Sequence, residues 1–152
     1  YYDTIDRKMA AQNICVRIRQ TEAGLLGTVK KHGENGISEE TGFRVETLPR
    51  FITYETCLTH RLGVLVTQRT DFAIGKIATL SFDRNFYLGE TDYEIELEFS
   101  EEQEIESLDG WYRACFPADR FRSKYERFLA ALDRLERENE TNERVIGKRD
   151  AL

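Results

Sequence analysis

Histidine and cysteine are scarce in this chain of 152 residues, and their scarcity disfavours zinc sites and disulfide frameworks. We interpret the two histidines, His32 and His60, as loop or surface residues, because two such ligands serve zinc poorly. The three cysteines, Cys15, Cys57 and Cys115, are odd in number and far apart. This pattern disfavours a disulfide framework or a thiolate zinc site, and we expect small buried hydrophobic residues in a reducing cytoplasm.

Proline, long apolar runs and excess positive charge are also lacking. Only two prolines interrupt the chain, which favours one continuous, compact domain. No apolar run approaches the ~18 residues that a membrane span needs, and no signal-peptide pattern opens the sequence. The net charge of −6 disfavours general binding to nucleic acids or anionic membranes, although a buried basic site would escape this argument. We therefore expect a cytoplasmic protein without nucleic-acid or membrane partners.

What the sequence does contain is a strict alternation of charged and apolar residues, clearest at residues 93–99. As a β-strand, this run places Glu94, Glu96 and Glu98 on one face and large apolar residues on the other. The apolar face must be buried. The three like charges repel one another, so a metal ion or a facing set of lysine and arginine side chains should compensate them.

Similar alternation predicts further strands at 13–20, 25–31, 38–46, 64–72 and 77–82, with a hairpin connection at 32–36. Helical spacing predicts a helix between Pro49 and Leu62. Capping boxes at 100–103 and 123–126 open two more helices, which run to about 115 and 135. The charged tail at 136–152 either frays or extends the last helix. The sum is an α+β domain built on an antiparallel sheet.

Charge is concentrated on the polar faces of these strands. Those faces carry Arg17, Arg19, Lys30, Glu40, Arg44, Arg69, Asp83 and the three glutamates. In a sheet curled into a barrel with its polar face inward, arginine and lysine could hold a polyanion while carboxylates hold hard cations. That combination predicts a site for a metal-bound polyphosphate. The alternative is a set of solvated outer faces with cross-strand ion pairs.

Several ordered motifs together resemble the CYTH domain of the triphosphate tunnel metalloenzymes, and in particular small bacterial CYTH proteins described as adenylate cyclases or triphosphatases. The resemblance spans residues 1 to about 132. Its motifs are Tyr1-Tyr2-Asp3-Thr4, Arg17-Ile18-Arg19, Thr28-Val29-Lys30, Thr67-Gln68-Arg69, Leu80-Ser81-Phe82-Asp83, Tyr87-Leu88-Gly89, residues 92–98 and Ser123-Lys124-Tyr125-Glu126-Arg127-Phe128.

The resemblance implies an eight-stranded antiparallel β-barrel, a tunnel whose polar lumen binds a triphosphate and Mg²⁺ or Mn²⁺, with helices outside and at the C-terminus. The residues that match its phosphate-binding positions are Arg17, Arg19, Lys30, Arg69 and Lys124, of which Arg69 and Lys124 are also our catalytic candidates. The matching metal ligands are Asp83, Glu94, Glu96 and Glu40. Weaker candidates are Glu98, Arg44 and Arg127. The alternative role of each is an ion pair that only satisfies its neighbours.

One family motif is missing. The Glu-x-Glu-x-Lys strand of the family precedes the Tyr-Tyr-Asp-Thr region, whereas this chain starts at Tyr1 without an initiator methionine. We expect an intact parent protein that carries the motif upstream, because loss of one strand from a closed barrel would expose unpaired strand edges. On this view, residues 1–152 are a single CYTH domain that lacks its first strand.

The resemblance favours metal-dependent hydrolysis of a triphosphate, with inorganic triphosphate as the preferred substrate. Adenylate cyclase and thiamine triphosphatase are the enzymatic alternatives. A non-catalytic module that binds polyphosphate or nucleotide is the alternative from another class. A homodimer is left open by the sequence.

Overall fold

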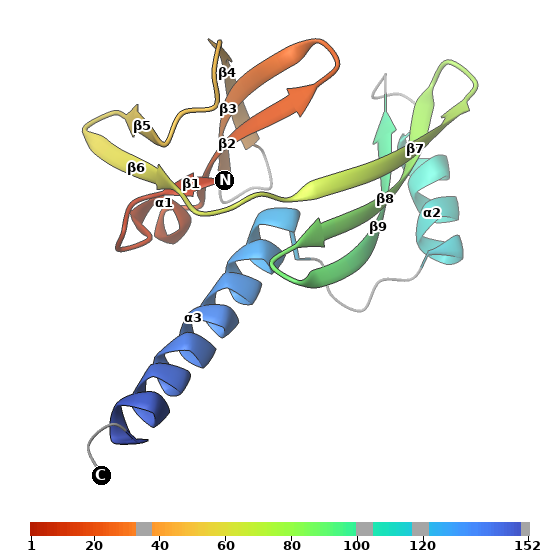
Figure 1. The fold of residues 1–152 in the computed structure, drawn as a ribbon. Helices are drawn as coiled ribbons and strands as arrows, with labels where there is room; N and C mark the ends of the chain where they lie inside the picture. The colour runs from red at the N-terminus through yellow and green to blue at the C-terminus, as the bar shows by residue number, and fades with distance from the viewer. Residues whose placement is uncertain (33–37, 100–104, 117–121, 150–152) are drawn as a thin grey trace. The chain divides into compact units, whose positions relative to one another are not determined.

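The computed structural model describes residues 1–32, 38–99, 105–116 and 122–149 (Figure 1). They form two compact units, Tyr1–Val64 and Leu65–Leu152. Each unit contains an antiparallel sheet, and the second also carries two long helices. The predicted α+β class with antiparallel strands is therefore confirmed. Within the described residues, no helix combines the length and the apolar character that spanning a membrane requires.

The first unit is a six-stranded sheet with the strand order β4-β3-β2-β1-β6-β5. Its strands are β1 (Tyr2–Asp3), β2 (Ile14–Thr21), β3 (Gly24–His32), β4 (Ser38–Val45), β5 (Phe51–Tyr54) and β6 (Cys57–Arg61). A short helix, α1 (Lys8–Ala11), follows β1. The predicted strands at 13–20, 25–31 and 38–46 are thus confirmed as β2, β3 and β4. The predicted turn at 32–36 falls mostly on residues outside those that the structure describes.

One face of this sheet carries the core of the first unit. The alternation in β2 directs Ile14 and Val16 into a cluster with Tyr2, Met9 and Val29. Two groups of the Tyr-Tyr-Asp-Thr motif hold this cluster in place. The buried Asp3 carboxylate accepts hydrogen bonds from the backbone N–H groups of Met9 and Ala10, and the Tyr2 hydroxyl donates to the carbonyl of Pro49 at 2.7 Å. In the described structure, this motif thus serves the packing of the first unit.

The predicted helix between Pro49 and Leu62 is wrong, because these residues form the hairpin β5–β6. The spacing of Phe51, Tyr54, Leu58 and Leu62 suggested one apolar helical face. Instead, Ile52, Tyr54 and Cys57 pack against the core, and Leu58 is 62% exposed. The hairpin turns at Glu55, whose φ of 52° lies in the left-handed region.

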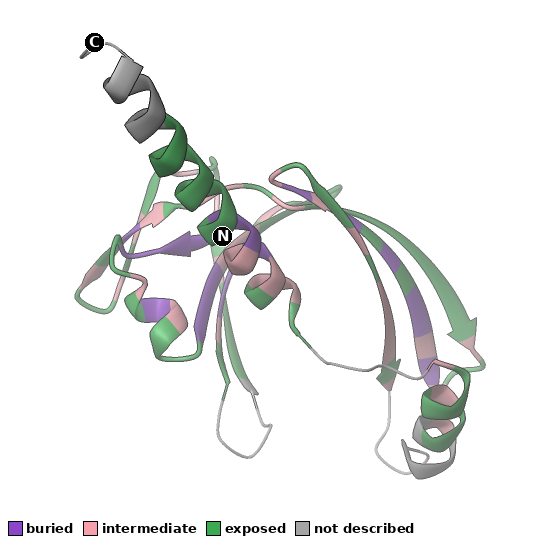
Figure 2. Cartoon of the chain, turned by 90° about the horizontal axis from the view of Figure 1, so that it is seen from below, coloured by how far each residue is buried: buried purple, intermediate pink, exposed green. Residues whose placement is uncertain are grey.

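The second unit begins with a three-stranded sheet of order β7-β8-β9. Its strands are β7 (Val66–Ile74), β8 (Ala78–Tyr87) and β9 (Glu90–Phe99). The strands predicted at 64–72 and 93–99 correspond to β7 and β9, whereas β8 continues to Tyr87, five residues beyond the predicted end at 82. Because side chains alternate along each strand, this sheet has one polar and one apolar face. The polar face includes Ser81, Asp83 and Asn85, which are at most 2% exposed, whereas Phe82 is 37% exposed. Figure 2 shows how buried and exposed residues are distributed over the strands.

Helix α2 (Ile105–Cys115) contacts the apolar face of this sheet. The ring of Phe116, just after α2, meets Phe82 edge to face, and the Tyr112 hydroxyl donates to the Ile95 carbonyl at 2.5 Å. The helix prediction at 100–115 is confirmed for residues 105–115. The capping box predicted at 100–103 lies outside the described residues.

Helix α3 (Lys124–Arg149) begins at the predicted second capping box. The Ser123 hydroxyl accepts a hydrogen bond from the backbone N–H of Glu126 at 3.2 Å, and the Glu126 carboxylate accepts one from the backbone N–H of Ser123 at 2.7 Å. The helix runs through the charged tail to Arg149, so the tail extends the helix rather than fraying at residue 136. Residues 133–142 are exposed.

The cysteines only partly match the expectation. Cys15 is buried, and burial raises the pKa of its thiol to about 11, so that it remains a neutral apolar group. Cys57 is half-buried and packs against the core, whereas Cys115 is exposed at the end of α2. All three thiols are free, as predicted.

Candidate metal- and phosphate-binding site

Strand register builds the candidate site of the second unit. Arg69 pairs with Asp83 across β7 and β8, and Asp83 pairs with Glu94 across β8 and β9. The next row on the same face ends in Glu96, opposite Ser81. Because residues two apart share a face, the alternation predicted for residues 93–99 places Glu94 and Glu96 beside Asp83.

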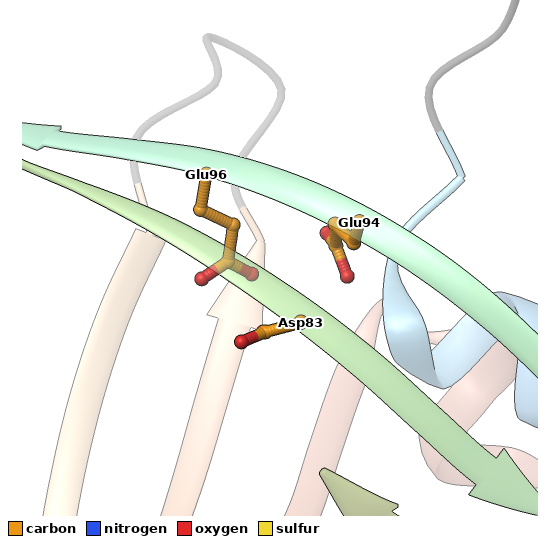
Figure 3. A group of neighbouring side chains, drawn as sticks. All are labelled: Asp83, Glu94 and Glu96. Carbon is orange, nitrogen blue, oxygen red and sulfur yellow. The ribbon is translucent and has the colours of Figure 1, made fainter. Parts of the chain in front are cut away.

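Three carboxylates converge on this face (Figure 3). One oxygen each from Asp83, Glu94 and Glu96 can be chosen so that all three lie within 4.8 Å of one another. The Asp83 side chain is fully buried, and those of Glu94 and Glu96 are 19% and 29% exposed. Three carboxylates at this spacing need compensating positive charge.

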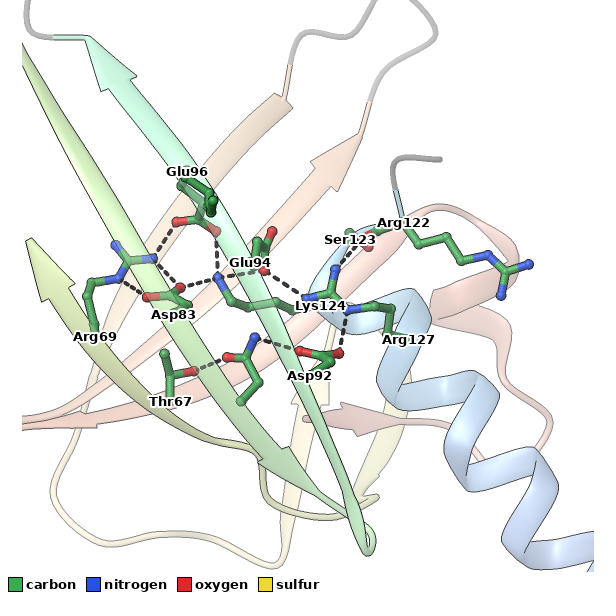
Figure 4. Close-up of polar contacts among 12 residues, drawn as sticks. Thr67, Arg69, Asp83, Asp92, Glu94, Glu96, Arg122, Ser123, Lys124 and Arg127 are labelled. Carbon is green, nitrogen blue, oxygen red and sulfur yellow. Dashed lines mark hydrogen bonds and ion pairs between the residues drawn. The ribbon is translucent and has the colours of Figure 1, made fainter. Parts of the chain in front are cut away.

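Lys124 and Arg69 supply that charge (Figure 4). The Lys124 Nζ lies 2.6 Å from Asp83 Oδ2, 3.0 Å from Glu94 Oε2 and 2.5 Å from Glu96 Oε1. Arg69 grips Asp83 in bidentate fashion, with both N–O distances at 2.7 Å, and also pairs with Glu96. A longer contact of 3.4 Å joins Arg69 to Glu98, which is 64% exposed. Of the three glutamates in the row, Glu98 is therefore the peripheral one.

These contacts shift the acidities of the groups that make them. Burial alone would raise the pKa of Asp83, but hydrogen bonds from Arg69 and Lys124 outweigh it and hold the pKa below its usual value. The pKa of Glu96 is lowered by the same balance, with Lys124 as the main partner. Burial opposes the charged form of Lys124, yet its three carboxylate partners raise its pKa above the ordinary value. Asp83, Glu96 and Lys124 are thus ionised at neutral pH.

A second network adjoins the first and was not predicted. Asp92 accepts hydrogen bonds from Asn85 at 2.9 Å, from the Tyr87 hydroxyl at 2.6 Å and from Arg127 Nε at 2.7 Å. Arg127 then reaches Glu94 through Nη2 at 2.8 Å. The weak candidate Arg127 is therefore a direct partner of a predicted metal ligand. Asp92 lies two residues before Glu94 on β9 and therefore on the same face of the sheet. This spacing could have predicted that Asp92 belongs to the site.

The predicted basic residues of the first unit share one face of their own sheet. Cys15, Lys30 and Glu40 form one row across β2, β3 and β4, and Arg17 and Arg19 follow at two-residue steps on β2. Arg17 Nη2 lies 3.4 Å from Glu40 Oε1, and its buried Nε has no hydrogen-bond partner among the described residues. Glu40 thus pairs with a basic neighbour and is not one of the three clustered carboxylates.

Comparison with known proteins decides the family. The model of the CYTH domain matches residues 1–109, which is most of the chain. The chain belongs to the CYTH family. A crystal structure from Bacillus halodurans, described as that of a candidate adenylate cyclase, shares the fold with a TM-score of 0.66 and 24% sequence identity. The match covers 84% of this chain and 79% of that one. Among curated proteins, no sequence matches this chain.

Because the chain belongs to the CYTH family, we asked whether Asp83, Glu94 and Glu96 could bind a metal ion. Three carboxylate oxygens within 4.8 Å are hard donors of the kind that Mg²⁺ and Mn²⁺ prefer, so the residues present fit such an ion. Lys124 lies outside residues 1–109, which match the CYTH model. We assign it to the site because its ammonium group contacts the carboxylates, as in its ion pair with Asp83. The metal and phosphate roles of all these residues remain predictions.

Proposed function

We propose that this CYTH protein hydrolyses a triphosphate with the help of a divalent cation, and that inorganic triphosphate is its substrate. One observation carries the proposal. Asp83, Glu94 and Glu96 come within 4.8 Å of one another on the same sheet face as Arg69, with Lys124 in contact with all three. Oxygen donors for a hard cation thus adjoin nitrogen donors for a polyanion, which is what metal-bound phosphate chemistry requires.

The residues divide into two roles. Asp83, Glu94 and Glu96 would hold Mg²⁺ or Mn²⁺, and Arg69 and Lys124 would neutralise the phosphate oxygens. For the first unit, the resemblance implies a metal ligand in Glu40 and phosphate-binding side chains in Arg17, Arg19 and Lys30. A bound divalent cation polarises phosphate oxygens and acidifies water, and so supplies the nucleophile without a reactive side chain. Catalysis on this account rests on positioning and electrostatics.

The direct test is phosphate release from inorganic triphosphate, ATP and thiamine triphosphate, each with Mg²⁺ or Mn²⁺ and with EDTA. We expect metal-dependent release, fastest from inorganic triphosphate. A preference for thiamine triphosphate would reassign the substrate within the same chemistry. Binding of triphosphate without any product would exclude the enzyme and favour a binding module.

Adenylate cyclase activity is the second candidate, because the Bacillus halodurans structure of the same fold is described in those terms. The two activities leave different products from ATP. A cyclase yields cyclic AMP and pyrophosphate, whereas a triphosphatase yields orthophosphate. Chromatography of the ATP reaction separates them, and cyclic AMP as the main product would replace our proposal.

A further inference from the structure

The ammonium group of Lys124 lies within 3.0 Å of an oxygen of each of the three carboxylates that would hold a metal. Its Nζ is 2.5 Å from Glu96, 2.6 Å from Asp83 and 3.0 Å from Glu94 (Figure 4). The oxygens concerned are Oδ2 of Asp83, Oε2 of Glu94 and Oε1 of Glu96. The Lys124 side chain is only 17% exposed, so water screens these contacts weakly. A lysine head is a compact point charge, which is the closest that a side chain comes to a bound cation.

The charge balance of the surrounding network points the same way. Five carboxylates, those of Asp83, Asp92, Glu94, Glu96 and Glu98, face three basic side chains, those of Arg69, Lys124 and Arg127. The network therefore carries two net negative charges. Each of its basic groups is already paired with at least two carboxylates. As it stands, this surface repels a polyanion, and one divalent cation would neutralise it.

We propose that Lys124 is an internal counter-ion that competes with the divalent cation for Asp83, Glu94 and Glu96. Binding of the cation displaces the ammonium group from the carboxylates, and the released Lys124 becomes free to pair with phosphate. Only this last step rests on the proposed function, because the competition itself involves no substrate. Lys124 thereby couples metal binding to phosphate binding: the group that grips phosphate is withheld until the metal is present.

The exchange requires movement of one side chain and not of the helix. Other contacts hold α3 to the sheet of the second unit. Arg127 pairs with Asp92 at 2.7 Å, Arg134 pairs with Glu90 at 2.6 Å, and the fully buried ring of Phe128 lies 6.1 Å from that of Tyr87. With these anchors in place, rotation about the four-carbon stem of Lys124 can carry its charge away from the carboxylates.

Mn²⁺ binding, measured by calorimetry without any triphosphate, tests the competition. In Lys124→Met the cation no longer has to displace an ammonium group, so we expect Mn²⁺ to bind about tenfold more tightly than to the wild type, or ~1.4 kcal/mol. Lys76→Met is the matched control. It removes the same charge from an exposed position between β7 and β8, and its Mn²⁺ affinity should stay within about twofold of wild type. Equal or weaker binding by Lys124→Met would overturn the proposal.

A second measurement uses the wild-type protein, in case Lys124→Met fails to fold once the three carboxylates lose this cation. The chain has six lysines, so the ¹³Cε–¹Hε signals of labelled lysine are few, and Lys124→Arg identifies the one of interest. Titration with Mg²⁺ should shift the Lys124 signal toward that of a solvent-exposed lysine and leave those of Lys76 and Lys8 unchanged. A Lys124 signal that stays in place at saturating Mg²⁺, or a protein that binds no divalent cation, would overturn the competition.

The two proposals fail separately. Tighter Mn²⁺ binding by Lys124→Met without phosphate release by the wild type would exclude the triphosphatase and leave the competition intact. Metal-dependent release by the wild type, with unchanged Mn²⁺ affinity in Lys124→Met, would do the reverse. If both hold, Lys124→Met shows an unusual combination: it binds the metal more tightly and turns over substrate more slowly.

Discussion

Asp83 is the most constrained residue of the site. Its side chain is fully buried, and its two oxygens accept from Arg69 and Lys124 at distances of 2.6–2.7 Å. A neutral replacement here would take from Arg69 and Lys124 their one fully buried carboxylate partner, so loss of activity could reflect loss of the fold. Glu96 is a better position at which to test the metal role, because its side chain is 29% exposed and can tolerate an amide.

Glu96→Gln should lower metal-dependent phosphate release by about 100-fold, because the amide binds the cation more weakly and pairs poorly with Lys124 and Arg69. Initial rates at saturating Mn²⁺ measure the effect, with circular dichroism as the check on folding. Glu98→Gln is the matched control on the same strand face, 64% exposed and 3.4 Å from Arg69, and should retain most of the rate. Equal losses in the two variants would contradict the metal assignment.

The candidate site could be predicted where strand alternation alone determined it. Asp83, Glu94 and Glu96 were predicted together, and they do converge. The role of Asp92 was not predicted, because it depends on hydrogen bonds from Asn85 and Tyr87 of the neighbouring strand. The contact of Lys124 with all three carboxylates could not be predicted either, since it depends on where α3 meets the sheet.

Helix α3 is attached to the sheet by two arginines in different settings. Arg127 bridges Asp92 and Glu94 and is 22% exposed, whereas Arg134 pairs with Glu90 alone and is 49% exposed. Partly buried ion pairs that also satisfy hydrogen bonds contribute more than exposed ones, because solvent screens the latter. The first turns of α3 should therefore carry most of its attachment.

Arg127→Met should lower the free energy of unfolding by about 2 kcal/mol, because Asp92 and Glu94 lose a shared partner. Arg134→Met, the control on the same helix, should cost clearly less, because solvent screens its exposed pair with Glu90. Urea unfolding followed by circular dichroism compares them. If Arg134→Met lowered the free energy of unfolding as much as Arg127→Met, the prediction that the two arginines contribute unequally would be wrong.

Among the secondary-structure elements, alternation identified the long strands, and the capping box identified the start of α3. The hairpin β5–β6 was mistaken for a helix because its strands have only four and five residues, too short to show a period of two clearly. Phe51, Tyr54 and Leu58 happened to follow helical spacing. The residues that pack on the core, Ile52, Tyr54 and Cys57, follow the register of the hairpin instead.

For the whole molecule, the ionised network predicts how stability depends on pH. The pKa values of Asp83, Asp92 and Glu96 are each lowered, because hydrogen bonds from their cationic and polar partners outweigh burial. In the unfolded chain these groups titrate near pH 4. Below that pH the unfolded state therefore binds more protons than the folded state. Stability is fully present above about pH 5 and is lost as the pH falls through the folded pKa values.

Urea unfolding of the metal-free protein in EDTA, at several values between pH 7 and pH 3, measures this dependence. The unfolding free energy should be nearly constant from pH 7 to pH 5 and should fall steeply below pH 4. Constant stability down to pH 3 would mean that the cluster does not hold its carboxylates ionised.

The central claim is that this CYTH protein is a metal-dependent triphosphatase, and phosphate release from inorganic triphosphate tests it most directly. The account predicts release with Mn²⁺ or Mg²⁺, loss of release in EDTA, and recovery when the metal is restored. Triphosphate that remains intact with either metal, or that is hydrolysed equally well in EDTA, would contradict it.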